Sequence, residues 1–125
     1  MSGSLRVLMA EDEVLAAEVL AEGLSEAGFT VLTAPDGQAA LELAAAGAAF
    51  DLLLTDLRMP RMDGRELIAR LRSERPDLPV VVMTGFPPPD GPAALNSGPA
   101  PLRLLTKPIQ IAPLVDALRS VAGLA

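Results

Sequence analysis

The 125-residue sequence contains no histidine, no cysteine, no tryptophan and no tyrosine. Without histidine and cysteine the chain has no imidazole base, no thiolate nucleophile and none of the usual nitrogen and sulfur ligands of zinc. Whatever chemistry occurs must therefore use carboxylates. The lack of cysteine also gives no sign of an oxidising compartment.

Basic residues are scarce as well. Ten lysines and arginines face sixteen aspartates and glutamates, which gives a formal net charge of −6. Binding to nucleic acid irrespective of its sequence needs basic surface that displaces counterions from phosphates, so we expect no direct contact with nucleic acid. Nine of the ten basic residues are arginine, and Lys107 is the only lysine. A single lysine in an arginine-rich chain suggests a specific role.

Long hydrophobic runs are missing, because a charge interrupts every apolar stretch after a few residues. No segment is long enough to cross a bilayer. The first six residues lack the apolar core and the small-residue cleavage site of a secretory signal. We therefore expect a cytoplasmic protein without membrane association.

Short apolar runs alternate with segments of helical periodicity. The apolar and β-branched runs are typical of buried strands, and the periodic segments are bounded by glycine, aspartate or proline, as helices are. This alternation predicts an α/β fold with an open, doubly wound parallel sheet, formed by one domain over residues 1–125 with a core at about 5–121. The expected strands are 5–10, 30–34, 51–56, 80–84 and 102–106, and the expected helices are 14–27, 38–46, 65–73 and 113–121.

Residues 85–101 interrupt the alternation, because six of the twelve prolines fall there. Proline breaks a helix from inside, so the fourth helix is expected to be short or irregular. Asp90 as N-cap and Pro92 in the first turn would permit roughly two turns through Asn96. We predict a mobile or irregular segment that carries partner specificity or the conformational response.

Polar residues mark the carboxyl ends of four expected strands. Glu11 and Asp12 follow the first strand, Asp56 ends the third, Thr84 ends the fourth and Lys107 follows the fifth. In a doubly wound sheet the binding crevice lies at these strand ends. Three carboxylates there would repel one another unless a cation neutralises them. Their hard oxygen atoms suit Mg²⁺, which accepts phosphate oxygens as further ligands, so the pattern indicates phosphoryl chemistry.

In this interpretation Asp56 is the nucleophile that receives a phosphoryl group as an acyl phosphate. Mg²⁺ and the ammonium of Lys107 would neutralise charge on the phosphoryl oxygens in the transition state. Thr84 would donate its hydroxyl to a phosphoryl oxygen once one is present. Gly85 beside it leaves room for a phosphodonor to approach.

Taken together, these segments resemble the receiver domain of bacterial two-component response regulators. The resemblance runs from about residue 5 to residue 118, which is nearly the whole chain. It implies a flavodoxin-like sheet with strand order 2-1-3-4-5. The matching segments are the acidic pair 11–12, the run LLTDLRMPRMDG at 53–64, Thr84-Gly85 and Thr106-Lys107-Pro108.

The resemblance also implies the roles of individual residues. Asp12 and Asp56 would bind Mg²⁺ directly, with Mn²⁺ as a substitute, and Glu11 would act through water. The backbone carbonyl of Arg58 would complete the protein's ligands, and no organic cofactor is implied. The Lys107-Pro108 peptide is expected to be cis.

A receiver is a phosphorylation-dependent switch in a phosphorelay. It is not a conventional enzyme, although it catalyses its own phosphorylation and dephosphorylation. The resemblance implies a phosphohistidine donor, either a histidine kinase or a histidine phosphotransfer protein. No output domain follows the last expected helix, so we expect a stand-alone response regulator or the receiver of a hybrid histidine kinase.

Two features depart from the family. Many receivers carry tyrosine or phenylalanine three residues before the lysine, and this ring turns inward when the threonine moves. The chain has Leu104 there, and Phe86 is the nearby aromatic residue that could replace it. Residues 85–101 also replace a full helix on the face that many receivers use to dimerise.

Simpler interpretations exist for the same residues. Glu11 and Asp12 could stabilise the start of the following helix through its dipole. Thr84 could be an ordinary strand residue, Lys107 a surface cation and Asp56 an exposed acid in a turn. The pair Asp63-Gly64 is expected to be a turn and a helix cap, and the row Glu18, Glu22 and Glu26 a solvated helix face.

Other protein classes fit less well. Phosphatases of the haloacid dehalogenase type usually need a second aspartate two residues after the nucleophile, where this chain has Arg58. A nucleotide-binding flavodoxin-like module would need a glycine-rich phosphate loop after the first strand. The alternative that stays open is a receiver-like interaction module that is not regulated by phosphorylation.

Overall fold

A computed structural model describes residues 5–91, 95 and 100–123. Five parallel strands form one sheet with the order β2-β1-β3-β4-β5, as the resemblance implied. The predicted strands are confirmed to within one residue at each end. They are β1 (Arg6–Ala10), β2 (Thr30–Ala34), β3 (Leu52–Asp56), β4 (Val80–Thr84) and β5 (Leu102–Thr106).

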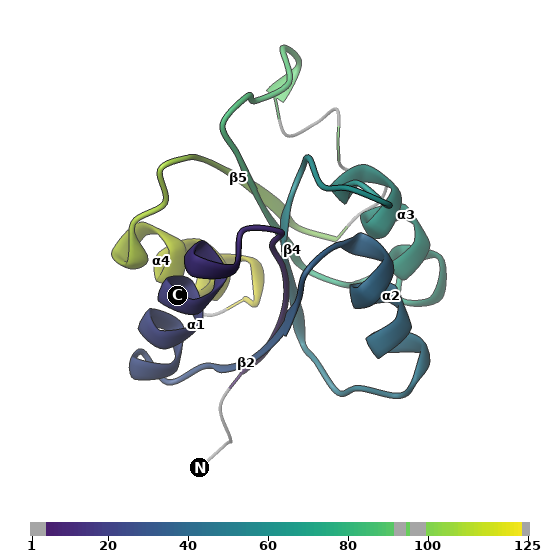
Figure 1. Cartoon of the computed structure of the whole chain (residues 1–125), viewed down its shortest axis with the longest axis horizontal. Coiled ribbons are helices and arrows are strands. Elements are labelled where there is room, and N and C mark those ends of the chain that lie inside the picture. The colour runs from purple at the N-terminus through teal and green to yellow at the C-terminus, as the bar shows by residue number, and fades with distance from the viewer. Residues whose placement is uncertain (1–4, 92–94, 96–99, 124–125) are drawn as a thin grey trace.

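In the described residues, four helices cover the two faces of this sheet (Figure 1). One face is covered by α1 (Val14–Glu26) and α4 (Ile111–Val121), and the other by α2 (Gly37–Ala45) and α3 (Gly64–Glu74). Among the described ranges no helix is long and apolar enough to span a membrane. The predicted α/β fold is therefore confirmed.

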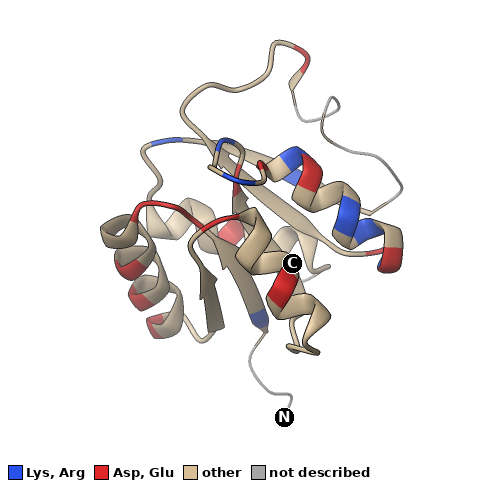
Figure 2. Cartoon of the chain, turned by 45° about the vertical axis from the view of Figure 1, so that its right-hand side comes forward, with Lys and Arg blue, Asp and Glu red and all other residues tan. Residues whose placement is uncertain are grey.

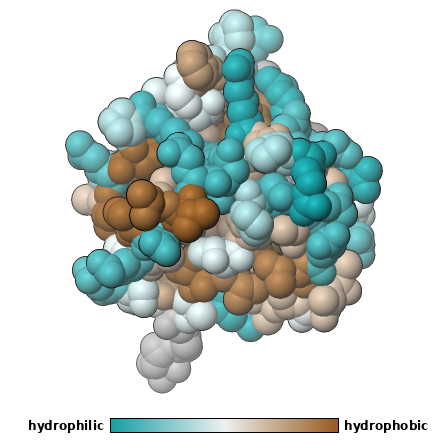
Figure 3. Space-filling view, viewed as in Figure 1, coloured by the Kyte–Doolittle hydropathy of each residue, from teal (hydrophilic) through white to brown (hydrophobic). Residues whose placement is uncertain are grey.

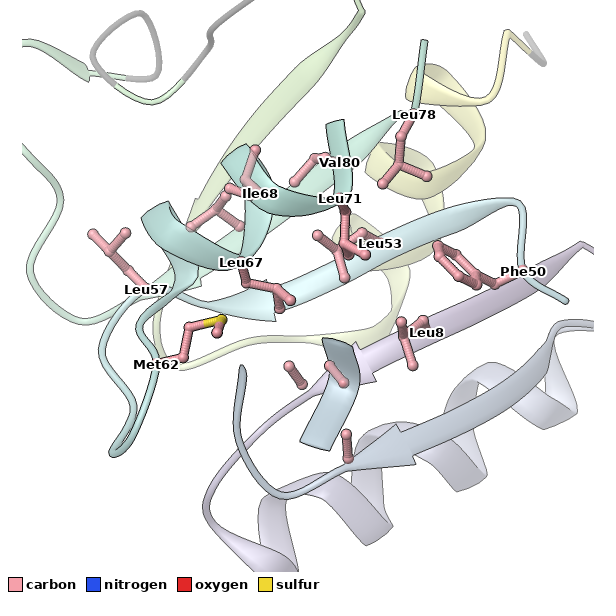
Figure 4. Close-up of a cluster of buried hydrophobic side chains, with 14 of the residues drawn as sticks. Leu8, Phe50, Leu53, Leu57, Met62, Leu67, Ile68, Leu71, Leu78 and Val80 are labelled. Carbon is pink, nitrogen blue, oxygen red and sulfur yellow. The ribbon is translucent and has the colours of Figure 1, made fainter. Parts of the chain in front are cut away.

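The core consists of two layers, one on each face of the sheet, because successive side chains of a strand point to opposite faces. On β3, Leu53 packs toward α3, whereas Leu52 and Leu54 pack toward α1 and α4. Figure 4 shows Leu67, Ile68 and Leu71 of α3 over Leu53. Every residue of β3 and β4 is buried, as expected for central strands covered on both faces.

Aspartates begin two of the helices. The side chain of Asp36 accepts a hydrogen bond from the N–H of Ala39 at 2.8 Å, and Asp63 accepts from the N–H of Glu66 at 3.0 Å. The cap predicted at Asp63 is confirmed, and Asp36 caps its helix in the same way. The last helix begins at Ile111, two residues before the predicted start, and this places Pro113 in its first turn, where helical N–H groups have no partner.

Between β4 and β5 the described residues contain no α-helix. Residues 85–91 begin with a bend at 85–86 and a turn follows at 89–90, where the N–H of Gly91 donates to the carbonyl of Pro88 at 2.9 Å. Leu95 and Ala100 are buried, and Leu95 joins the core on the α3 face. The rest of the predicted helix at 90–96, and the mobility predicted for the segment, lie outside the described residues.

Arg72 anchors the chain where it enters β5. Its side chain comes from α3 and is only 6% exposed. The guanidinium donates to the carbonyls of Leu78, Ala100 and Pro101 at 3.0–3.2 Å. A planar group with five donors can serve several carbonyls at once, so this one side chain secures the amino ends of the parallel strands β4 and β5 to α3.

Candidate functional site

The five polar residues predicted at the strand ends lie together at the carboxyl edge of the sheet. Because β1, β3, β4 and β5 are consecutive neighbours, their ends meet there. Asp12, Asp56, Thr84 and Lys107 line one pocket of about 270 Å³. Glu11, which is 2% exposed, lies beside them and forms an ion pair with Lys107. None of the five is displaced from the site.

Asp56 is the most unusual side chain of this group. It is 2% exposed, and neither carboxylate oxygen accepts a hydrogen bond from the described residues. Its close cationic neighbour is Lys107, whose Nζ lies 2.7 Å from Oδ1 without hydrogen-bond geometry. The same Nζ lies 3.5 Å from Oε1 of Glu11. One ammonium thus faces two buried carboxylates.

This environment shifts the pKa values of all three groups. Burial, reinforced by the neighbouring Glu11, raises the pKa of Asp56 to about 8, and Lys107 only partly opposes this rise. Burial also acts to raise the pKa of Glu11, but the neighbouring Asp56, the hydrogen bond from the N–H of Glu13 and the ammonium of Lys107 together lower it. The carboxylates raise the pKa of Lys107 despite burial. The two acids retain one proton near neutral pH unless further positive charge is present.

The same carboxylates can hold a metal ion. Glu11, Asp12 and Asp56 each offer an oxygen, and these atoms lie within 4.8 Å of one another. Oxygen donors of this kind suit Mg²⁺, and the two oxygens of Asp56 are free of hydrogen bonds that would compete for a cation. The residues therefore fit the metal expected from the sequence.

Thr84 ends β4 beside Asp56 and is 3% exposed. Its Oγ1 accepts a hydrogen bond from the N–H of Phe86 at 3.1 Å, and its carbonyl accepts from the N–H of Lys107 at 2.8 Å. A Cβ placed on Gly85 would meet no atom within 4 Å. The space beside Gly85 is therefore open, as expected for an approach route.

The loop after β3 is held close to the site by contacts that the sequence did not reveal. Arg61 has a φ of 68°, and its guanidinium donates to both carboxylate oxygens of Asp36 at 2.9 and 3.1 Å. A Cβ on Gly64 would overlap the carbonyl oxygen of Asp56, so only glycine allows this approach. The motif DG at 63–64 signalled a turn, but nothing in the sequence indicated the pair between Asp36 and Arg61, which are 25 positions apart.

Arg58 and Phe86 also line the pocket. The guanidinium carbon of Arg58 lies 4.9 Å from the centroid of the Phe86 ring. The sequence pointed to the backbone carbonyl of Arg58 and not to its side chain. Leu104 is half buried and packs against the core on the α3 face, and the Lys107-Pro108 peptide is cis, as predicted.

The chain is similar to known proteins in sequence and in structure. Residues 7–119 match the family model of the response regulator receiver domain. The chain is 40% identical to the transcriptional regulatory protein PdtaR of Mycobacterium tuberculosis over 114 residues, covering 90% of this chain and 54% of PdtaR. It is 35% identical to the response regulator receiver protein CpdR of Brucella abortus over 119 residues, covering 93% of this chain and 95% of CpdR.

Solved structures agree with these matches. A response regulator receiver protein from Sinorhizobium medicae superposes with a TM-score of 0.85 at 29% identity, covering 96% of this chain and 95% of that one. The receiver domain of the hybrid histidine kinase CckA gives 0.77 at 31% identity, with 94% and 98% covered. Among the curated relatives, the chain spans only 34% of the response regulator MprA of Mycobacterium ulcerans and 54% of PdtaR.

Proposed function

The chain belongs to the response regulator receiver family of two-component signalling proteins, and we propose that it is a phosphorylation-dependent switch whose phosphoacceptor is Asp56. Receiver domains are signalling proteins and not conventional enzymes. The observation that carries the proposal is the state of Asp56 itself, a buried carboxylate without hydrogen bonds, with an ammonium at 2.7 Å and two further acids beside it. We infer one receiver domain over residues 1–125, with its core at about 5–121.

In the proposed reaction a carboxylate oxygen of Asp56 attacks the phosphorus of a phosphohistidine. The new O–P bond forms as the N–P bond breaks, and the electron pair of that bond stays on the imidazole nitrogen of the donor. Asp56 must be ionised for this attack, yet burial and Glu11 hold its pKa at about 8. Bound Mg²⁺, or Mn²⁺ in its place, would supply the positive charge that ionises Asp56 and neutralises phosphoryl oxygens.

Glu11, Asp12, Asp56 and the backbone carbonyl of Arg58 are the groups that would hold this ion. The ammonium of Lys107 would leave its ion pair with Asp56 and donate to a phosphoryl oxygen, because an ammonium acts as a point charge toward phosphate. Its present partners are the carboxylates of Glu11 and Asp56, so its ammonium already lies beside the phosphoacceptor.

Thr84 would stabilise the product. Its hydroxyl lies at the end of the neighbouring strand and can donate to a phosphoryl oxygen once the group is attached. The open space beside Gly85 would admit the donor. The same site, with water as the nucleophile, would later return Asp56 to its free form, so the receiver would catalyse both its phosphorylation and its dephosphorylation.

A protein donor fits the surface next to the site. Val14, Leu15 and Val19 of α1 are 66–76% exposed. An apolar groove beside them is lined by Leu15, Val19 and Ile109, and it reaches Lys107 of the phosphoacceptor pocket. Figure 3 shows a hydrophobic patch on the side of the molecule where α1 and α4 lie. A histidine kinase or histidine phosphotransfer protein docked there would bring its phosphohistidine to Asp56.

The exposed charges of α1, beside the apolar groove, differ from those of α3 on the other face of the sheet. Figure 2 shows acidic bands along α1, which carries the exposed Glu18, Glu22 and Glu26, and a mixture of signs along α3. The acidic row would favour a donor whose contact helix carries basic residues beside its apolar ones.

Intact mass spectrometry tests the proposal. The protein is incubated with Mg²⁺ and either acetyl phosphate or phosphorylated histidine kinases, and a stoichiometric phosphoryl adduct is expected. Asp56→Asn should abolish the adduct. Asp51→Asn is the matched control, because Asp51 lies at the other end of β3 and pairs with Arg6. The lack of an adduct with every competent donor would instead support the interaction module that phosphorylation does not regulate.

A further inference from the structure

A cation–π contact joins the two loops on either side of the phosphoacceptor pocket. Arg58 belongs to the loop after β3 and Phe86 to the loop after β4, and their separation is 4.9 Å from guanidinium carbon to ring centroid. Phe86 is 68% exposed, whereas Phe29 and Phe50 are each 6% exposed in the core. The chain has three aromatic residues, and Phe86 is the one that is exposed. It lies at the candidate site.

Thr84 is linked to this contact through the backbone. Its Oγ1 accepts a hydrogen bond from the backbone N–H of Phe86 at 3.1 Å, so the hydroxyl is bonded to the backbone of the residue whose ring stacks on Arg58. A phosphoryl group on Asp56 would offer the hydroxyl a charged acceptor, and hydrogen bonds to charged acceptors are stronger than neutral ones. Threonine has discrete χ1 positions, so Oγ1 would leave Phe86 in one step.

We propose that the Arg58–Phe86 contact is a latch, closed while Thr84 accepts the N–H of Phe86 and opened when a phosphoryl group captures the Thr84 hydroxyl. The inference rests on the proposed phosphorylation of Asp56. Opening frees the N–H of Phe86, shifts the ring away from Arg58 and uncouples the loops after β3 and β4. A stacking contact at the surface is weak enough for the loss of one hydrogen bond to open it.

The latch carries the effect of phosphorylation from Thr84 to the surface, which no aromatic residue of β5 can do in this chain. Leu104 stands where many receivers carry an aromatic ring, and it packs into the core on the α3 face. It therefore has no ring that could move in response to Thr84. Phe86 is hydrogen-bonded to the threonine through its backbone N–H and lies at the surface, so its movement changes what a partner protein meets beside the pocket.

The test is nitrogen-15 NMR of the amide of Phe86 and of the side-chain Nε–Hε groups of arginine, recorded on the full chain. The reference is the Mg²⁺-loaded protein, and the second spectrum follows phosphorylation by acetyl phosphate, with intact mass measured on the same sample. We expect the Phe86 amide to exchange with solvent roughly tenfold faster and the Arg58 Nε–Hε signal to lose its ring-current shift.

The chain contains a matched internal control. Arg75 stacks on Phe50 with a separation of 4.7 Å and also donates to the Phe50 carbonyl, far from the strand ends that form the site. Its Nε–Hε signal should not move on phosphorylation. A change of equal size in both arginine signals would overturn the latch, because it would indicate a general rearrangement.

Variants of Thr84 test the trigger without any phosphoryl group. Thr84→Val removes the acceptor of the Phe86 N–H, so the unphosphorylated variant should already show the open signals of Phe86 and Arg58. Thr84→Ser keeps the hydroxyl and should show the closed signals. If Thr84→Val leaves both signals closed, the latch is wrong.

The wild-type result separates the latch from the function on which it rests. A full phosphoryl adduct with unmoved Phe86 and Arg58 signals would refute the latch and leave the proposed function intact. Failure to form any adduct would refute both.

Discussion

Asp56→Asn should stabilise the metal-free protein, although it removes the proposed phosphoacceptor. The wild-type carboxyl is buried, accepts no hydrogen bond and lies beside Glu11, and these conditions raise its pKa to about 8 from a usual value of 3.8. An acid whose pKa is raised on folding destabilises the folded state once the unfolded chain can ionise. Asparagine has a similar shape and no charge, so this cost disappears.

The size of the effect follows from the pKa shift. At pH 7 the folded protein must keep Asp56 protonated while the unfolded chain ionises it, which costs at most about 4 kcal/mol. The lowered pKa of Glu11 has the opposite effect, and the contact with Lys107 is lost in the variant. We therefore expect a net gain of about 1–3 kcal/mol in the free energy of unfolding.

The upward shift of the Asp56 pKa predicts how the free energy of unfolding depends on pH. The contribution of Asp56 to the free energy of unfolding of the wild type is most favourable below about pH 4. This contribution is lost progressively as the pH rises toward 8, by up to about 1.4 kcal/mol per pH unit. The advantage of Asp56→Asn should accordingly grow between pH 5 and pH 8.

Urea unfolding in the presence of EDTA, followed by circular dichroism, measures this difference; intrinsic fluorescence is unsuitable because the chain lacks tryptophan and tyrosine. Asp51→Asn is the control, because it should change the free energy of unfolding in the opposite direction. Arg6 lowers the pKa of Asp51, so this variant should lose up to about 1 kcal/mol in the free energy of unfolding. Saturating Mg²⁺ should stabilise the wild type by about 3 kcal/mol at a hundred times its Kd and Asp56→Asn far less. A variant less stable than the wild type at pH 8 without metal would refute the reasoning.

Three further predictions concern the site and the anchoring of the sheet. Gly64→Ala should lower the free energy of unfolding by about 2–3 kcal/mol, because the added Cβ overlaps the Asp56 carbonyl. Gly85→Ala is the control and should change the free energy of unfolding by less than about 0.5 kcal/mol, because its Cβ meets no atom within 4 Å. Urea unfolding compares the two variants. Lys107→Met should slow phosphorylation from acetyl phosphate by at least about tenfold with an unchanged dichroism spectrum, and equal rates would exclude its role at the phosphoryl group. Arg72→Met should cost about 2–4 kcal/mol of stability and speed amide exchange in β5, because three carbonyls lose a hydrogen bond from the guanidinium; unchanged exchange would show that Arg72 does not anchor the strand.

Local patterns were sufficient for most of the fold. The strands at 30–34, 80–84 and 102–106 were predicted with their observed bounds, because a short apolar run between breakers has few alternatives. The helix boundaries differed by one or two residues, since helix ends depend on the last hydrogen bonds as well as on residue type. The start of α4 was the largest difference, because Pro113 is compatible with any position in the first turn.

The site residues were predictable because a parallel sheet collects the ends of its strands at one edge. Once the strands were assigned, Asp56, Thr84 and Lys107 had to lie near one another, and their residue types already indicated phosphoryl chemistry. This part of the argument needed only strand order and the alternation of side chains.

The sequence by itself therefore determined the sheet, the membership of the receiver family and the set of residues at the strand ends. Only the tertiary structure decided how those groups interact: that Lys107 contacts both Glu11 and Asp56, that Asp56 accepts no hydrogen bond, and that Arg58 stacks on Phe86. The physical reason is that strands and caps depend on neighbours in sequence, whereas contact pairs and pKa values depend on distances and burial set by distant segments.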